Sequence, residues 1–149
     1  MKPKISIITP LFNSSNHIEE MINSVKQQSF KNWELIIIDD CSTDNSVKII
    51  KKIKNKNIKY IRNKKNLGAG LSRNIGTKVA KGRYITFIDS DDKWHKDYLS
   101  KTFKFMKKKK CEFVFTSYYW MEEEGKMNGK FNVPNVVDYK YILKTNPIS

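Results

Sequence analysis

The segment that decides the fold lies at residues 33–44 and reads WELIIIDDCSTD. Its first six residues form a near-continuous apolar run, which is typical of a strand covered on both faces of a parallel sheet. The run leads into Asp39-Asp40, and Ser42-Thr43-Asp44 then favours the start of a helix. This order predicts a strand, a polar loop, and a helix that carries the chain back along the sheet.

The same pattern recurs along the chain. Apolar runs predict further strands at residues 5–8, 58–61, 84–88 and 112–120, with a weaker one near 131–133. Apolar residues at helical spacing predict helices between them, as in Ile18, Met21, Ile22 and Val25. Further helices are expected after Asp44, at 68–80, at 96–109 and at 138–144.

Strands that alternate with helices and are apolar throughout belong to parallel sheets. With right-handed crossovers, the predicted fold class is α/β, with an open, doubly wound, mostly parallel sheet and helices on both faces. The chain has 149 residues, and two domains of half that length would each be undersized. We therefore expect one domain over residues 1–149.

The composition is basic, with 29 Lys and Arg, 15 Asp and Glu, and a formal charge of +14. Only three of these residues are arginine, whereas proteins that read bases depend on arginine forks. We therefore expect no nucleic acid partner, while attraction to phosphate groups or an anionic membrane stays open. Cys41 and Cys111 match no disulfide or metal spacing, and no apolar run approaches the roughly 20 residues of a membrane span. We expect a cytoplasmic chain, with peripheral contact at the inner membrane face as an option.

Polar residues gather where the predicted strands end. In an open α/β sheet, ligands bind beyond the carboxyl ends of the strands, near the point where the strand order reverses. The segment Asp89-Ser90-Asp91-Asp92 follows one strand, and its crowded carboxylates suit Mg²⁺ or Mn²⁺. The alternative is an acidic turn that caps the next helix. Asp39-Asp40 has the same two interpretations, a ligand contact or a helix cap.

Two further loops have binding potential. The loop at 9–13 lacks glycine-rich dinucleotide and phosphate-loop motifs, but Phe12 offers a face on which a base can stack. A buried core phenylalanine is the alternative. The turn at 66–70 is glycine-rich and begins a helix, so its N–H groups suit an anion, with Arg73 one turn further on. A tight turn with a surface salt bridge is the alternative there.

In combination, these motifs resemble glycosyltransferase family 2, the inverting enzymes of the GT-A fold. The matching segments, in order, are SIITPLFN at 6–13, Ser24-Val25 with Gln28, IDDCSTD at 38–44, NLG at 66–68, SRNIG at 72–76, GRYI at 82–85 and FIDSDD at 87–92. The resemblance is firm over about residues 4–100. It implies a nucleotide-diphospho-sugar transferase, a UDP-sugar donor, a divalent Mn²⁺ or Mg²⁺ ion, and a saccharide or lipid-linked acceptor in polysaccharide biosynthesis.

The resemblance also implies roles for individual residues. Thr9, Pro10 and Phe12 would hold the base, and Asp40 would meet the uracil N–H. Asp89 and Asp91 would be the aspartates of a D-x-D motif, with Asp89 near the ribose. The implied donor-binding set is Thr9, Pro10, Phe12, Asp40, Gly68, Arg73, Asp89 and Ser90, and the implied metal set is Asp89, Asp91 and Asp92.

Three departures from the family pattern matter. Phe12 stands where tyrosine is frequent, so stacking survives without the hydroxyl. Cys41 stands where glycine is frequent, so we expect its turn to avoid positive φ. Family members are longer, and their acceptor site and general base lie in the later half, so we expect the base beyond Ser149. The chain is then the donor half of a longer enzyme or a shortened relic.

The predicted function is therefore sugar transfer from a nucleotide-diphosphate sugar to a hydroxyl acceptor, with a metal assisting departure of the diphosphate. The alternatives are a binding module that transfers nothing, a haloacid-dehalogenase-like phosphatase built on Asp89-Ser90-Asp91, and a basic nucleic-acid binder.

Overall fold

The computed structural model describes residues 2–122 and 126–134. The helix predicted at 138–144 lies outside the described residues. The chain divides into two compact units, residues 1–103 and 104–149, and each is described by itself. Within the described part, no helix combines the length and the apolar character needed to cross a bilayer.

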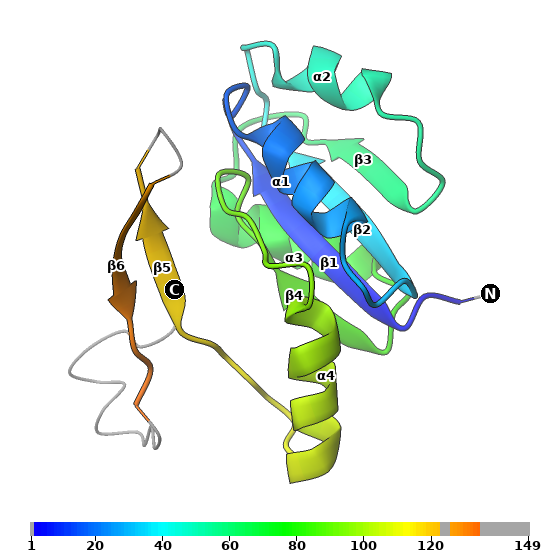
Figure 1. Cartoon of the computed structure of the whole chain (residues 1–149). Helices are drawn as coiled ribbons and strands as arrows, with labels where there is room; N and C mark the ends of the chain where they lie inside the picture. Colours follow the sequence, from blue (N-terminus) through cyan, green and yellow to red (C-terminus); the bar gives the residue numbers. More distant parts are fainter. Residues whose placement is uncertain (1, 123–125, 135–149) are drawn as a thin grey trace. The chain divides into compact units, whose positions relative to one another are not determined.

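The first unit is built on a four-stranded sheet (Figure 1). Its strands are β1 (Ile5–Leu11), β2 (Trp33–Asp39), β3 (Ile58–Arg62) and β4 (Tyr84–Phe87). They lie in the order β3-β2-β1-β4, and every neighbouring pair is parallel. The chain thus winds outward from β1 to β3 and then returns to pair β4 with the other side of β1. The predicted parallel sheet is confirmed, with the reversal of strand order between β1 and β4.

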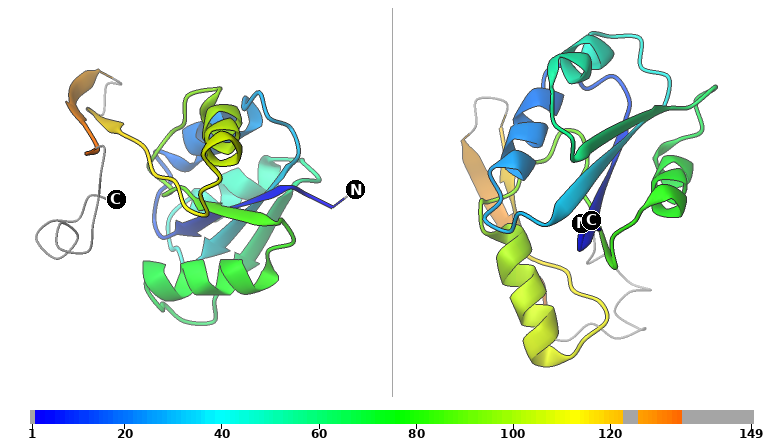
Figure 2. Two further views of the ribbon diagram at one scale, coloured as in Figure 1. Left: turned by 90° about the horizontal axis from the view of Figure 1, so that it is seen from below. Right: turned by 90° about the vertical axis from the view of Figure 1, so that its right-hand side faces the viewer.

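Helices cover both faces of this sheet, as predicted (Figure 2). They are α1 (Ile18–Lys26), α2 (Ser46–Lys52), α3 (Ala69–Val79) and α4 (Tyr98–Lys109), of which residues 98–103 belong to the first unit. The apolar side of α1 is fully buried and packs with residues of β1 and β2 in the main core.

The opposite face of the sheet is covered by α3. Gly76 allows a close approach there, because a Cβ at this position would lie 2.5 Å from Cγ2 of Ile8. The loop before α3 contacts Asp40 after β2, and Arg73 in the second turn of α3 contacts Asp89 after β4.

The second unit contains a hairpin of β5 (Tyr118–Met121) and β6 (Met127–Phe131), which pair antiparallel. The strand predicted at 112–120 is therefore wrong over 112–117, which form no strand. A strand persists only where a partner supplies hydrogen bonds, and the pairing starts at Tyr118 opposite Phe131. The rings of these two residues stack with centroids 5.0 Å apart.

Candidate functional site

Loops from different strands meet at the carboxyl edge of the sheet. We call the segments 12–15, 40–44, 63–68 and 89–92, together with Arg73, the loop cluster. The N–H of Thr43 donates to Oδ1 of Asn13 at 2.8 Å, which joins the first two segments. The hydroxyls of Ser14 and Ser90 hydrogen-bond at 2.6 Å and join the first to the last. The structure thus brings the three polar strand ends of the sequence to one place.

Asp40 lies at the centre of the loop cluster and is 3% exposed. Its Oδ1 accepts hydrogen bonds from Nδ2 of Asn63 and the N–H of Leu67, both at 2.8 Å. Its Oδ2 accepts the N–H of Gly68 at 2.6 Å. Burial raises the pKa of Asp40, but these hydrogen bonds outweigh burial, and the net pKa lies below the ordinary value. The carboxylate is therefore held ionised and orders the loop before α3.

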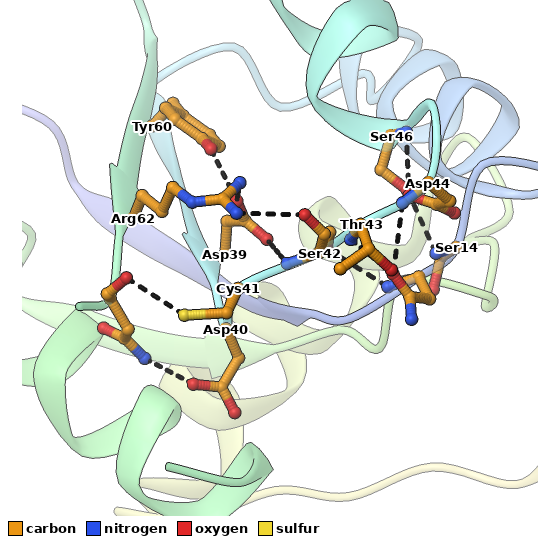
Figure 3. Close-up of polar contacts among 12 residues, drawn as sticks. Ser14, Asp39, Asp40, Cys41, Ser42, Thr43, Asp44, Ser46, Tyr60 and Arg62 are labelled. Atoms are coloured by element: carbon orange, nitrogen blue, oxygen red, sulfur yellow. Dashed lines mark hydrogen bonds and ion pairs between the residues drawn. The ribbon is translucent and has the colours of Figure 1, made fainter. Parts of the chain in front are cut away.

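Asp39 points to a different set of partners (Figure 3). It is fully buried, and its Oδ2 accepts hydrogen bonds from the Tyr60 hydroxyl at 2.6 Å and the Arg62 guanidinium at 2.7 Å. Its Oδ1 accepts the N–H of Ser42 at 2.8 Å. The adjacent acids Asp39 and Asp40 thus have separate structural surroundings.

The turn after Asp40 corrects one expectation from the sequence. Cys41 has φ of +70°, a left-handed conformation that we expected a non-glycine residue to avoid. The surrounding contacts hold this conformation. Arg62 donates to the carbonyl of Ser42 at 3.0 Å, and the Cys41 thiol donates to the carbonyl of Asn63 at 3.2 Å. The expectation that Cys41 avoids positive φ was therefore wrong. The contacts that hold this conformation come from β3 and the loop after it, which are distant in the sequence.

The loops after β1 and β2 are joined by hydrogen bonds in both directions. Oδ1 of Asn13 accepts the N–H of Thr43 at 2.8 Å, and the Ser42 hydroxyl accepts the N–H of Asn13 at 3.1 Å. In return, Asp44 accepts the N–H of Ser15 at 2.8 Å. Burial raises the pKa of Asp44, but hydrogen bonds from Ser46 and Ser15 outweigh burial, and the net pKa is lowered. These exchanges fix the loop that carries Phe12.

The three residues proposed for base binding differ in exposure. Phe12 is 50% exposed, so part of its side chain is open to contact with a ligand. Thr9 and Pro10 are buried in β1. Oγ1 of Thr9 is fully buried and has no hydrogen-bond partner among the described residues. Of these three residues, only Phe12 is exposed to a ligand.

The acidic segment after β4 lies next to α3. Arg73, in the second turn of α3, donates to Oδ1 of Asp89 at 2.5 Å, and both side chains are partly exposed. Ser90 is buried, whereas Asp91 and Asp92 are exposed. Partial burial of its carboxyl group and repulsion from Asp91 and Asp89 raise the pKa of Asp92. Asp92 as a whole residue is exposed, so a cation can reach its carboxylate. A bound cation would offset the repulsion from Asp91 and Asp89 that helps to raise this pKa.

No group of three or more His, Cys, Asp or Glu side chains is arranged to hold a metal ion in the described parts of the chain. The carboxylates at 89–92 are therefore not a complete metal centre made by protein ligands alone. They do fit an ion that takes its remaining ligands from a substrate diphosphate, as Mg²⁺ commonly does.

Sequence reasoning missed Tyr60, Arg62, Asn63 and Ser72 at this site. Asn63 and Ser72 are buried, and Nδ2 of Asn63 donates to both Asp40 and the Ser72 hydroxyl. The polar residues that directly follow the third apolar run were the available signal. They mark the carboxyl end of β3 in the same way that Asp39-Asp40 mark the end of β2.

The comparison with known proteins agrees with this architecture. Residues 6–144 match the family described as glycosyl transferase family 2. The chain therefore belongs to glycosyltransferase family 2.

Relatives in this family have assigned names. TuaG of Bacillus subtilis, named as a glycosyltransferase of teichuronic acid biosynthesis, is 41% identical over 99% of this chain and 60% of its own length. WfaP of Escherichia coli is named as a UDP-Glc:α-D-GlcNAc-diphosphoundecaprenol β-1,3-glucosyltransferase. It is 40% identical over 94% of this chain and 55% of its own.

A solved structure shows the same fold. The crystal structure of Staphylococcus aureus TarS 1-349 in complex with UDP-GlcNAc superposes with a TM-score of 0.67 at 38% identity. The match covers 70% of this chain and 31% of that one. The chain thus spans less than two thirds of the length of these relatives.

Proposed function

We propose that this chain is the donor-binding part of an inverting glycosyltransferase that uses a nucleotide-diphosphate sugar, most simply a UDP-sugar. The observation that carries the proposal is the loop cluster, in which an exposed aromatic ring, a buried ionised carboxylate and an exposed acidic segment are tied together by hydrogen bonds. The TarS structure contains UDP-GlcNAc and the name of WfaP specifies UDP-Glc, and both support this donor class. The family is one of sugar transfer, which speaks against the phosphatase alternative.

The two ends of the loop cluster suit the two ends of such a donor. Phe12 would stack on the base, and the free acceptor capacity of Asp40 Oδ2 would meet a base N–H. Asp89 would lie near the ribose, held by Arg73, which would also face the phosphates. Gly68 serves the site through its N–H, which fixes Asp40. Thr9, Pro10 and Ser90 would shape the site from buried positions.

The acidic end would hold a divalent ion. Asp91 is the strongest candidate ligand, because it is exposed and Asp89 already accepts a hydrogen bond from Arg73 through Oδ1. Asp92 would contribute once the repulsion among the carboxylates is relieved. Bound Mn²⁺ or Mg²⁺ would supply Lewis-acid stabilisation of the departing diphosphate.

The reaction would exchange one bond for another at the anomeric carbon of the donor sugar. An acceptor hydroxyl attacks this carbon, the bond to the diphosphate oxygen breaks, and the hydroxyl proton passes to a base that we assign to no residue of this chain. The role of the loop cluster is to hold the nucleotide so that the leaving group is oriented opposite the attack.

The proposal is tested by calorimetry of UDP binding with and without Mn²⁺. We expect Asp91→Ala to remove the manganese-dependent part of the affinity, because this change deletes the exposed carboxylate ligand. Unchanged manganese-dependent affinity would refute the assignment of Asp91, and absence of any UDP binding by the unmodified chain would refute the donor site. Glycosyl transfer by this chain alone would exclude the alternative that it only binds.

We further propose a saccharide or lipid-linked acceptor and peripheral contact with the cytoplasmic face of a membrane. The name of WfaP specifies a diphosphoundecaprenol-linked acceptor for that protein. In this chain, Lys104 and the run Lys107–Lys110 are exposed, and exposed lysines of this kind are attracted to anionic lipids. Co-sedimentation with phosphatidylglycerol vesicles, lost at high salt and with phosphatidylcholine alone, is the expected result. Equal sedimentation with both lipids would contradict it.

A further inference from the structure

We infer that Tyr60 and Arg62, on the edge strand β3, are positioning residues that hold the base-binding end of the loop cluster through Asp39. The inference rests on the proposed donor site, since it concerns how Asp40 and Phe12 are held for a nucleotide. Neither residue belongs to the set that sequence motifs singled out.

Arg62 bridges the two ends of the turn that follows β2. Its guanidinium spans the turn, with one nitrogen 2.7 Å from Oδ2 of Asp39 and the other 3.0 Å from the carbonyl of Ser42. The Tyr60 hydroxyl donates to the same Oδ2 at 2.6 Å. Asp39 lies opposite Arg62 in the parallel register of β2 and β3, so the strand pairing itself presents the guanidinium to the turn (Figure 3).

We call the hydrogen bonds of Tyr60 and Arg62 to Asp39 and Ser42 the clamp, and they restrain the turn after β2. Between Asp39 and Ser42, Cys41 adopts φ of +70°, which a side chain with a Cβ rarely adopts and which persists only where surroundings enforce it. Asp40 is the residue before it, and its carboxylate must stay aligned with the N–H groups of Leu67 and Gly68. A relaxed turn would rotate that carboxylate away from its present position.

The same turn also supports the loop that carries Phe12. The Ser42 hydroxyl accepts the N–H of Asn13, the residue that follows Phe12. Loss of the clamp is therefore expected to disturb both sides of the base at once. Asp91 belongs to the loop after β4, whose contacts through Ser14–Ser90 and Arg73–Asp89 include neither Asp39 nor Arg62. The diphosphate end should be spared.

The protonation states suit this role. Burial, together with the hydrogen bond to Asp39, raises the pKa of Tyr60, so its hydroxyl remains a donor at neutral pH. The hydrogen bond with Tyr60 and the charge of Asp39 raise the pKa of Arg62, so the guanidinium stays charged. The clamp is then independent of pH near neutrality.

The experiment compares two probes that report on opposite ends of the donor site. Calorimetry with the full chain measures affinity for UDP and for inorganic pyrophosphate, each with Mn²⁺. The variants are Arg62→Met, Arg62→Lys and Tyr60→Phe. The matched control is Lys59→Met, which removes the same charge from an exposed position of the same strand.

We expect Arg62→Met to weaken UDP binding by about tenfold, the loss of one charge-assisted clamp, while pyrophosphate affinity changes by less than about twofold. Arg62→Lys should recover part of the UDP affinity, because an ammonium pairs with Asp39 without also reaching Ser42. Tyr60→Phe should weaken UDP binding by about threefold, and Lys59→Met should change neither affinity.

Several results would overturn the inference. One is UDP affinity in Arg62→Met within about twofold of the unmodified chain. Another is an equal loss for UDP and pyrophosphate, which would mark a general structural defect. If circular dichroism shows that Arg62→Met is unfolded, the test uses Tyr60→Phe instead. An unchanged UDP affinity in that variant, or an equal loss for UDP and pyrophosphate, would then overturn the inference. If the unmodified chain binds pyrophosphate but not UDP, the proposed donor site itself fails.

Discussion

The substitution Asp40→Asn tests the central carboxylate of the loop cluster. The carboxylate accepts three N–H groups while almost fully buried. An amide keeps one acceptor oxygen, which still serves Asn63 and Leu67, but its NH₂ group then faces the N–H of Gly68. Hydrogen bonds to charged groups contribute about 1.5–3 kcal/mol each, so loss of one and weakening of two should destabilise the fold by about 2–4 kcal/mol.

The dependence on pH gives this prediction a second test. The pKa of Asp40 is lowered from 3.8 by folding, so ionisation of this group contributes stability that is fully present above pH 3.8. That contribution is lost as the pH falls through the lower, folded-state pKa. The difference in unfolding free energy between the unmodified chain and Asp40→Asn should therefore stay constant from pH 7 to about 5 and shrink below 3.8.

The assay is urea unfolding followed by circular dichroism, with Asp91→Asn as the control. The control makes the same chemical change at an exposed position and should alter stability by less than about 0.5 kcal/mol. A stability of Asp40→Asn within about 0.5 kcal/mol of the unmodified chain would refute the reasoning. A difference that grows as the pH falls below 3.8 would refute the assigned direction of the pKa shift.

The other predictions concern packing, stacking and loop closure. Gly76→Ala should destabilise the chain by about 1–2 kcal/mol in urea unfolding, because the new Cβ meets Ile8 at 2.5 Å. Gly70→Ala, in the same helix but facing open space, should not destabilise it; similar losses in both would contradict the packing argument. Phe12→Ala should weaken UDP binding about fivefold without lowering the melting temperature, whereas a stability loss above 2 kcal/mol would show a core role instead. Ser14→Ala removes the bond to Ser90 and should weaken manganese-dependent UDP binding about threefold by calorimetry; an unchanged affinity would show that this contact does not orient the acidic segment.

Part of the fold is readable from local sequence. The apolar run at 33–38 and the helical spacing from Ile18 to Val25 predict elements that the structure contains, because burial on a given face leaves a period in the sequence. The run at 112–120 shows the limit of this reasoning. It is as apolar as the other strands, but only Tyr118–Met121 has a partner strand, and an apolar run does not report whether a partner is available.

The candidate site also has parts that the sequence predicts and parts that only the structure shows. Local sequence marks which segments are polar and which residue types they offer, and the resemblance of those segments to a known family assigns their general role. Residue chemistry alone does not distinguish Asp39 from Asp40, which are adjacent and chemically identical, and only the resemblance to the family selects Asp40. The structure separates them, because the β2–β3 register sets Asp39 opposite Arg62, while Asp40 meets the loop before α3.

The conformation of Cys41 and the contact between Ser14 and Ser90 likewise belong to tertiary structure alone. Sequence by itself determined the strands and helices of the first unit and the chemistry available at their ends, since both depend on neighbouring residues. Only the tertiary structure decided which distant side chains meet, because those contacts are set by how separate elements pack. The deciding features are the strand order, the strand register and the close packing of α3 on Ile8.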